Sequence, residues 1–365
     1  MRIDCDDTVH YPLGGASYIF KSSFIKYIAS QITKKNIIIS IGAQPNSSPH
    51  LGTLCVFSLA FSLADKLSKY NNDLNVKVLF EVVDTAPAEI LEIDGVRYQK
   101  DLNISKVMSD VFPQYKEILK YFGEKYNISY EIRMQKEFNS LKEVTDVDLY
   151  ILDHIDEIAK VLDPDKGKLR MRTACPICGL TDKEGEKNVY VGHKITAYCP
   201  YHGEFIIDAE LESYKLEYNT PLRNLIRAIA YAKLNASSSF DSEYIRITGN
   251  EYAGFYQEQL MYKVASGFEF DFSKLPIIVY CPMITDWSGA KLSKSLYVKK
   301  GAYKELPLFL QNYKGLSDKY GVKGLDVISK LTDEWLDDPK KLFRDYSIYY
   351  IQKRFEEYDH EIANI

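Results

Sequence analysis

The 365-residue sequence lacks features that would place it in several classes of protein. It has no apolar stretch that we judge long enough to cross a bilayer, and it begins with mixed charge rather than a basic and then apolar leader. Internal repeats and low-complexity segments are also missing. We therefore expect a cytoplasmic protein without a membrane partner.

Strongly basic character is missing too, because the formal net charge is -5 at pH 7. This balance argues against a protein that coats nucleic acid, although a local basic face would still bind RNA. Hydrophobic residues make up 46% of the chain, enough for a substantial core in two or three domains. Nothing in the composition indicates the oligomeric state.

Only three of the six cysteines cluster in the sequence. Cys175, Cys178 and Cys199 occur with His202 in two knuckles, Cys-Pro-Ile-Cys-Gly and Cys-Pro-Tyr-His-Gly. Four such ligands form a closed tetrahedral site, so we predict a structural Zn²⁺. His193 is an alternative fourth ligand, and free thiols beside a chance histidine are the other interpretation.

Apolar runs and helical periodicity predict an α/β protein with a doubly wound, Rossmann-type parallel sheet that is split by the zinc-bearing insert. Ser48 is the candidate N-cap of the helix that follows the first strand, with Pro49 at the first helical position. We expect strands at 37–40, 76–83, 244–247 and 276–280, and helices at 51–67, 149–162, 222–232 and 338–358.

These elements divide the chain into four expected parts. The first half of the Rossmann-type domain spans residues 1–145 and the insert with the zinc knuckles spans 146–217. The second half spans 218–300, and a short C-terminal helical region spans 301–365.

The turn after the first strand binds phosphate in many α/β proteins through glycines, but here it reads Gln-Pro-Asn-Ser-Ser-Pro-His-Leu-Gly. It places His50 at a helix start, where exposed N–H groups and the helix dipole attract an anion. Later in the chain, Lys291 and Lys294 stand three apart in a loop suited to stabilising negative charge on phosphate. A capping histidine and a solvated basic loop are the alternatives.

In this order, His50-Leu51-Gly52-Thr53, the cysteine-bearing insert and Lys291-Leu292-Ser293-Lys294-Ser295 resemble a known family, the class I aminoacyl-tRNA synthetases, whose signatures are HIGH and KMSKS. The resemblance covers about residues 35–300. The chain is most similar to the class I lysyl-tRNA synthetases, with the glutamyl and glutaminyl enzymes as neighbours. The features similar to the lysyl type are the Pro-Asn-Ser-Ser-Pro-His turn, the cysteine-bearing insert and Pro221-Leu222-Arg223 after it. Only residues 296–365 follow the second signature, so we expect it to lack the large anticodon-binding domain of a lysyl enzyme.

The resemblance implies a ligase that joins an amino acid to the α-phosphate of ATP, releases pyrophosphate and transfers the acyl group to tRNA. It implies that His50, Lys291 and Lys294 are the catalytic residues that neutralise phosphate charge. Mg²⁺ would share this role, although no carboxylate cluster marks a dedicated site. Lysine is the first expectation for the amino acid.

The resemblance also implies which residues bind the substrates. Amino acid and ribose would be bound by Asp84, Glu251 and Tyr252, with helix capping as the alternative role of both acids. ATP would be bound by Gln44, Asn46, His50, Gly52, Thr53, Gly249, Ser293 and Ser295.

Two other functions stay open at this point. A truncated synthetase paralogue would transfer the activated amino acid to a carrier protein, a small amine or a modified nucleoside. A non-catalytic module would only bind nucleotide, amino acid or tRNA, but the combination of His50 with two loop lysines argues against it.

Overall fold

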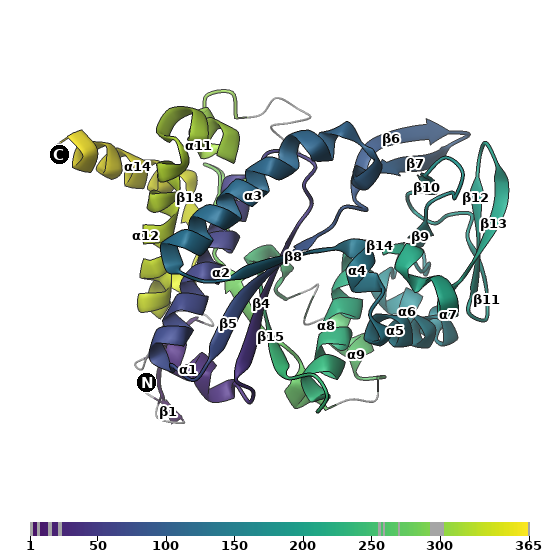
Figure 1. Cartoon of the computed structure of the whole chain (residues 1–365), viewed down its shortest axis with the longest axis horizontal. Helices are drawn as coiled ribbons and strands as arrows, with labels where there is room; N and C mark the ends of the chain where they lie inside the picture. The colour runs from purple at the N-terminus through teal and green to yellow at the C-terminus, as the bar shows by residue number, and fades with distance from the viewer. Residues whose placement is uncertain are drawn as a thin grey trace.

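The computed structural model describes residues 3–5, 8–13, 17–20, 24–254, 257, 260–268, 271–292 and 303–363. Its centre is a five-stranded parallel sheet in the order β16-β15-β4-β5-β8 (Figure 1). The chain builds the sheet outward from β4 in one direction and then returns to add two strands on the other side. This order confirms the predicted doubly wound α/β fold. The strands are β4 (Asn36–Ala43), β5 (Asn75–Val82), β8 (Tyr130–Met134), β15 (Ser242–Gly249) and β16 (Ile277–Cys281).

Helices cover both faces of the sheet, because its inner strands carry apolar side chains on both faces. In β4, Ile37, Ile39 and Ile41 belong to one core cluster, whereas Ile38 belongs to the other. The first cluster includes α1 (Phe24–Gln31), α2 (Leu51–Tyr70), α3 (Lys106–Tyr126) and α12 (Leu325–Asp337). The second includes α5 (Lys142–Asp153), α6 (Ile155–Leu162) and α8 (Thr220–Ala236).

The helix α2 corrects our expectation that no apolar run could span a membrane. By length and composition it is sufficient to do so. However, 67% of its most apolar window is buried inside the protein, where it packs against the sheet and α12. A core helix meets the same criterion, and the burial explains its composition.

Several expected boundaries shift in the structure. Ser48 is not the N-cap of α2; His50 is, and its ring nitrogen accepts a hydrogen bond from the backbone N–H of Thr53. The expected helix at 149–162 is broken at His154 into α5 and α6. By contrast, α8 begins close to the expected start at residue 222, with Asn219 as its cap and a proline in its first turn.

The cysteine-bearing insert and the C-terminal helices lie at opposite ends of the molecule, with the parallel sheet between them (Figure 1). The hairpin of β6 (Pro87–Ile93) and β7 (Val96–Asp101) projects from the first half of the sheet and pairs with β10 (Leu180–Asp182) of the insert. The rest of the insert contains α7 (Ala209–Glu212), β9 (Met171–Thr173), β11 (Val189–Val191), β12 (Lys194–Cys199), β13 (Gly203–Asp208) and β14 (Leu216–Tyr218).

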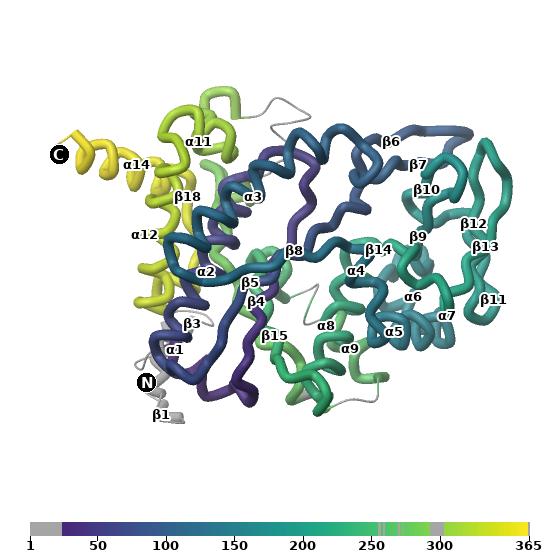
Figure 2. The backbone as a smooth tube through the Cα atoms, viewed as in Figure 1, coloured from purple at the N-terminus to yellow at the C-terminus, as the bar shows by residue number. Residues whose placement is uncertain are grey.

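The expected helix at 338–358 is also interrupted, because the chain forms a short strand between two helices. In the tube view, α12 of this region lies beside α2 (Figure 2). Its elements are α11 (Tyr313–Tyr320), α12, α13 (Pro339–Leu342), β18 (Tyr346–Ser347) and α14 (Ile348–Ala363), and β18 pairs with β17 (Ile284–Thr285). The remaining described elements are β1 (Ile3–Cys5), β2 (Thr8–Leu13), β3 (Ser17–Phe20), α4 (Gln135–Asn139) and α9 (Tyr262–Ala265).

One buried acid lies in the core between α5 and α8. The hydroxyl of Tyr218 donates to a carboxylate oxygen of Asp148 at 2.7 Å, and the other oxygen of that carboxylate is buried without a hydrogen bond. Burial raises the pKa of Asp148 to about 8, although the Tyr218 hydrogen bond acts in the opposite direction.

This shift predicts a pH dependence of stability that Asp148→Asn removes. Between about pH 4 and pH 8 the folded protein holds a proton that the unfolded chain has released, so wild-type stability falls as pH rises. The free energy of unfolding of the variant, relative to wild type, should increase by up to about 1.4 kcal/mol per pH unit. Urea unfolding at pH 5, 6, 7 and 8 measures this difference, and parallel pH profiles would contradict it.

Candidate active site

A cleft of about 740 Å³ opens at the carboxyl ends of β4, β5 and β15. It lies where the strand order reverses, between β4 and β15, which is the usual ligand position in open α/β sheets. Residues from the loop after β4, from α8, from the end of β15 and from the segment after β16 line it. Most of the residues that the sequence singled out are brought together here.

His50 lines the cleft at the first turn of α2. Its Nδ1 accepts from the N–H of Thr53 at 3.3 Å, so the imidazole is held over the start of the helix. A Cβ at Gly52 would lie 3.1 Å from the ring, and glycine leaves the room that the imidazole occupies. Gln44, Asn46, Gly52 and Thr53 line the same side of the cleft.

Gly249, Glu251, Tyr252 and Lys291 also line the cleft. Lys291 Nζ and Glu251 Oε1 form an ion pair at 2.5 Å. A Cβ at Gly249 would overlap the Glu251 carboxylate, so glycine is required for the carboxylate to fold back over the strand end. The predicted residues Ser293, Lys294 and Ser295 lie outside the described residues.

Asp84 follows β5 but does not line the cleft. It is 6% exposed, and one carboxylate oxygen accepts from the backbone N–H of Gln135 at 3.2 Å, at the start of α4. Burial raises its pKa. This position matches the helix-capping alternative better than contact with a substrate ammonium.

Three arginines that sequence reasoning did not assign to the site also line the cleft: Arg223, Arg227 and Arg246. Their signal in the sequence was weak, because a few basic residues in the largely apolar α8 and β15 do not by themselves indicate a cleft. Period-2 alternation would have placed Arg246 on the same face of the sheet as Glu81, since β4, β5 and β15 are in register. That face is covered by α8.

Glu81, buried in β5, pairs with two arginine side chains, one from β8 and one from α8. It contacts Arg133 of β8 and lies 3.0 Å from Arg227 of α8, and the Tyr231 hydroxyl donates to it. Burial would raise the pKa of Glu81, but the two guanidinium groups outweigh it and hold the pKa at about 2. The carboxylate is therefore ionised, and it interacts with Arg133, Arg227 and Tyr231 inside the fold.

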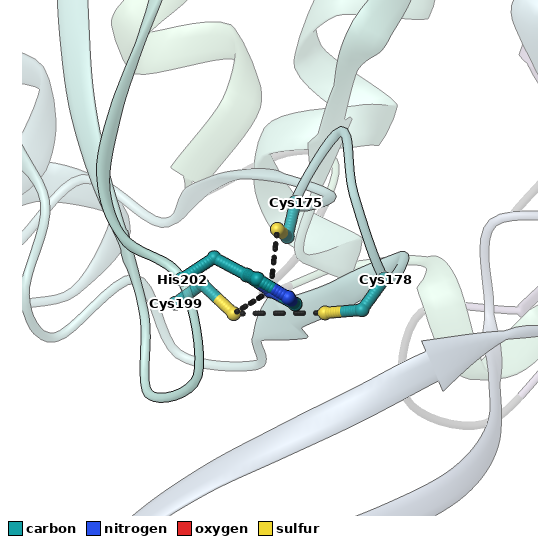
Figure 3. A group of neighbouring side chains, drawn as sticks. All are labelled: Cys175, Cys178, Cys199 and His202. Carbon is teal, nitrogen blue, oxygen red and sulfur yellow. Dashed lines mark hydrogen bonds between the residues drawn. The ribbon is translucent and has the colours of Figure 1, made fainter.

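The four predicted metal ligands converge in the insert (Figure 3). Sγ of Cys178 is 3.6 Å from Sγ of Cys199, and Nδ1 of His202 is 3.6 and 3.5 Å from Sγ of Cys175 and Cys199. Tetrahedral zinc with Zn–S of about 2.3 Å and Zn–N of about 2.0 Å places sulfurs about 3.8 Å apart and sulfur and nitrogen about 3.5 Å apart. The donor set and its spacing fit zinc.

The knuckle glycines support the same site. Gly179 and Gly203, directly after Cys178 and His202, have φ of +73° and +77°, a conformation that a side chain would strain. His193 is a different case: its ring nitrogens lie 2.6 and 3.1 Å from Glu210 and Asp153. The alternative of His193 as fourth ligand is therefore wrong, and His202 takes that position.

Comparisons with known proteins add distant structural likenesses. No family model and no curated protein matches the sequence. The crystal structure of a glutamate-tRNA synthetase from Elizabethkingia anophelis is similar at 11% identity and a TM-score of 0.40, over 87% of this chain and 66% of that one. An arginyl-tRNA synthetase from Plasmodium falciparum is similar at 10% identity and a TM-score of 0.33, over 83% of this chain and 52% of that one. This chain thus spans half to two thirds of their lengths, and likeness this distant assigns neither substrate nor activity.

The ligand geometry predicts different outcomes for two histidine variants. His202→Ala should lose zinc and lower the melting temperature, because the insert is too small to be stable without its metal. His193→Ala should keep one zinc per chain. Metal content by mass spectrometry, with melting temperature before and after chelation, checks both, and equal zinc content in the two variants would contradict the assignment.

Proposed function

We propose that this chain is an ATP-dependent, amino acid-activating enzyme of the class I synthetase type. In the proposed reaction, a carboxylate oxygen of the amino acid forms a bond to the α-phosphorus of ATP. The bond from that phosphorus to the bridging oxygen breaks, and pyrophosphate leaves. A ribose hydroxyl at the 3′ end of a tRNA then bonds to the acyl carbon and loses its proton, the bond from that carbon to the phosphate oxygen breaks, and AMP leaves.

The observation that carries this proposal is that His50, Glu251 and Lys291 line one cleft at the switch point of the sheet. Displacement at phosphorus needs positioning and charge neutralisation more than an acid–base pair. The first turn of α2 supplies N–H groups and an imidazole for an anion, and Lys291 supplies a cation in the same cleft. Lys294 is proposed as a second cation from the resemblance alone.

Glu251 has two roles in this proposal. Its ion pair orients Lys291, which is 41% exposed and otherwise free to sample many rotamers. Its carboxylate also faces the cleft, where ribose hydroxyls or the substrate ammonium would hydrogen-bond to it. Mg²⁺ would enter with the triphosphate and supply further charge neutralisation.

The residues in the cleft constrain the identity of the amino acid and of the acceptor less than they constrain the type of reaction. The lysyl resemblance makes lysine the first expectation, and the charges that line the cleft bear on that point below. A tRNA is the proposed acceptor. Transfer to a carrier protein, a small amine or a modified nucleoside is distinguished by whether charged tRNA forms.

The proposal is tested by amino acid-dependent exchange of pyrophosphate into ATP, measured across the twenty amino acids and followed by charging of total tRNA. Exchange with at least one amino acid is the expected result. No exchange with any of them would overturn the proposal.

His50→Asn separates the chemical role of His50 from its structural one. Asparagine is a good N-cap and keeps an acceptor for the Thr53 N–H, so the melting temperature should change little. Loss of the imidazole should lower exchange by about 100-fold or more, as for loss of a transition-state contact. His360→Asn, on α14 and outside the cleft, is the matched control. Wild-type exchange in His50→Asn would exclude a catalytic role for His50.

A further inference from the structure

The wall of the cleft formed by α8 and the sheet is unusual in its charge. Arg223, Arg227 and Arg246 line it and are only 7%, 4% and 9% exposed. Arginines this deeply buried normally pair with carboxylates, because an isolated buried charge is costly. The number of carboxylates that pair with these arginines therefore decides how much of their positive charge is neutralised.

Two buried glutamates provide the pairing. Glu81 serves both Arg133 and Arg227, as described above. Glu217 of β14 serves both Arg172, at 3.2 Å, and Arg223, which it contacts directly. Each carboxylate is thus shared between two guanidinium groups.

Arg246 has no such partner. Its one hydrogen bond to a side chain runs from Nη1 to the hydroxyl of Ser40 at 2.8 Å, and within the described parts of the chain no carboxylate lies within 4.0 Å of it. Burial and the nearby Arg227 lower the pKa of Arg246 to about 10, so it stays charged at pH 7. A Cβ at Gly42 would lie 3.1 Å from Nη2 of this guanidinium, and glycine leaves it space at the cleft.

The balance of charge along this wall is therefore positive. Burial lowers the pKa of Arg172, but three further acids nearby, Asp101, Glu184 and Asp182, act in the opposite direction. The other four arginines, Arg133, Arg223, Arg227 and Arg246, have only the two shared glutamates among the described residues. A buried cation without a partner carboxylate is costly to the fold, and such a group indicates a site where a bound anion neutralises its charge.

Because α2 and α8 cover opposite faces of the sheet, the cleft has two chemically distinct ends. His50 lies at the start of α2, with the proposed phosphate-binding groups. The arginines lie on the α8 side. A substrate that spans the switch point would place its phosphates at one end and another anionic group at the other.

We propose that the wall of Arg223, Arg227 and Arg246 binds the side-chain carboxylate of the amino acid, so that the enzyme activates an acidic amino acid of the aspartate and glutamate class. This assignment rests on the proposed function and replaces lysine as its substrate. The ammonium group of lysine would face like charges in a desolvated site, whereas a carboxylate would form bidentate pairs with guanidinium groups.

Wild-type protein gives the first test. Pyrophosphate exchange with glutamate, aspartate, glutamine, asparagine, lysine and leucine should favour one acidic amino acid over its amide and over lysine by at least about 100-fold in kcat/KM. Preference for lysine or a neutral amino acid would overturn the acidic assignment but leave amino acid activation standing. Because the wild-type chain is used, misfolding of a variant does not affect this result.

Arg246→Gln gives the second test. It should raise KM for the acidic amino acid by at least about 10-fold and leave KM for ATP unchanged, while Arg246→Lys should retain part of the acidic preference. Arg344→Gln, an exposed arginine outside the cleft, is the matched control. A rise in KM for ATP alone would overturn the assignment, because the arginines would then bind the triphosphate.

A direct binding measurement tests the anion subsite independently of the proposed reaction. Calorimetry with L-glutamate and L-aspartate, without ATP, should detect binding to wild type and Arg344→Gln and weaker binding to Arg246→Gln. If exchange fails with every amino acid but this pattern holds, the proposed reaction is wrong and the anion subsite stands. Equal binding by all three proteins would overturn the subsite.

Discussion

The buried carboxylate of Glu81 is the constraint on which the site depends. It sits in the middle of a parallel sheet, on the face that α8 covers, and it connects β5, β8 and α8 through Arg133, Arg227 and Tyr231. Removal of one member of such a buried pair leaves a charge without compensation, at a cost of about 3–5 kcal/mol. The same contacts that attach α8 to the sheet therefore also set the charge of the cleft wall.

This coupling explains why the fold was more predictable than the site. The strands and α8 were predicted because each rests on a local pattern: apolar runs for β4 and β5, and a polar cap followed by proline for α8. The zinc ligands were predicted because each knuckle supplies two of them within a short turn. The arginine wall was missed because the carboxylate that pairs with it is distant in sequence: Glu81 and Arg227 are 146 residues apart. Only strand order and register bring them together.

The error at Ser48 has a similar origin. Ser48 has the right side chain for an N-cap, but its hydroxyl donates to Gln114 at 2.7 Å and accepts from the N–H of Lys314 at 3.0 Å. The N–H of Tyr313 in turn donates to the carbonyl of Pro49. The C-terminal helices thus fix the turn that carries His50, and no local pattern in that turn reveals contacts with residues so distant in sequence. For this reason, the C-terminal helical region acts as part of the site's scaffold and shares the core of α2.

The two ends of the cleft differ in how easily their residues can be substituted without loss of stability. Lys291 and Glu251 are partly exposed, and an ion pair at such a position contributes little to stability. The arginines are buried and share their carboxylates with the contacts between sheet and helix. The proposed phosphate-binding groups at the exposed end are therefore replaceable one at a time, at small cost to the fold. Under the proposed assignment, a change in the amino acid side chain that the wall binds would require several buried charges to change together. The residues that set the specificity of the cleft are therefore also residues that stabilise the packing of α8 on the sheet.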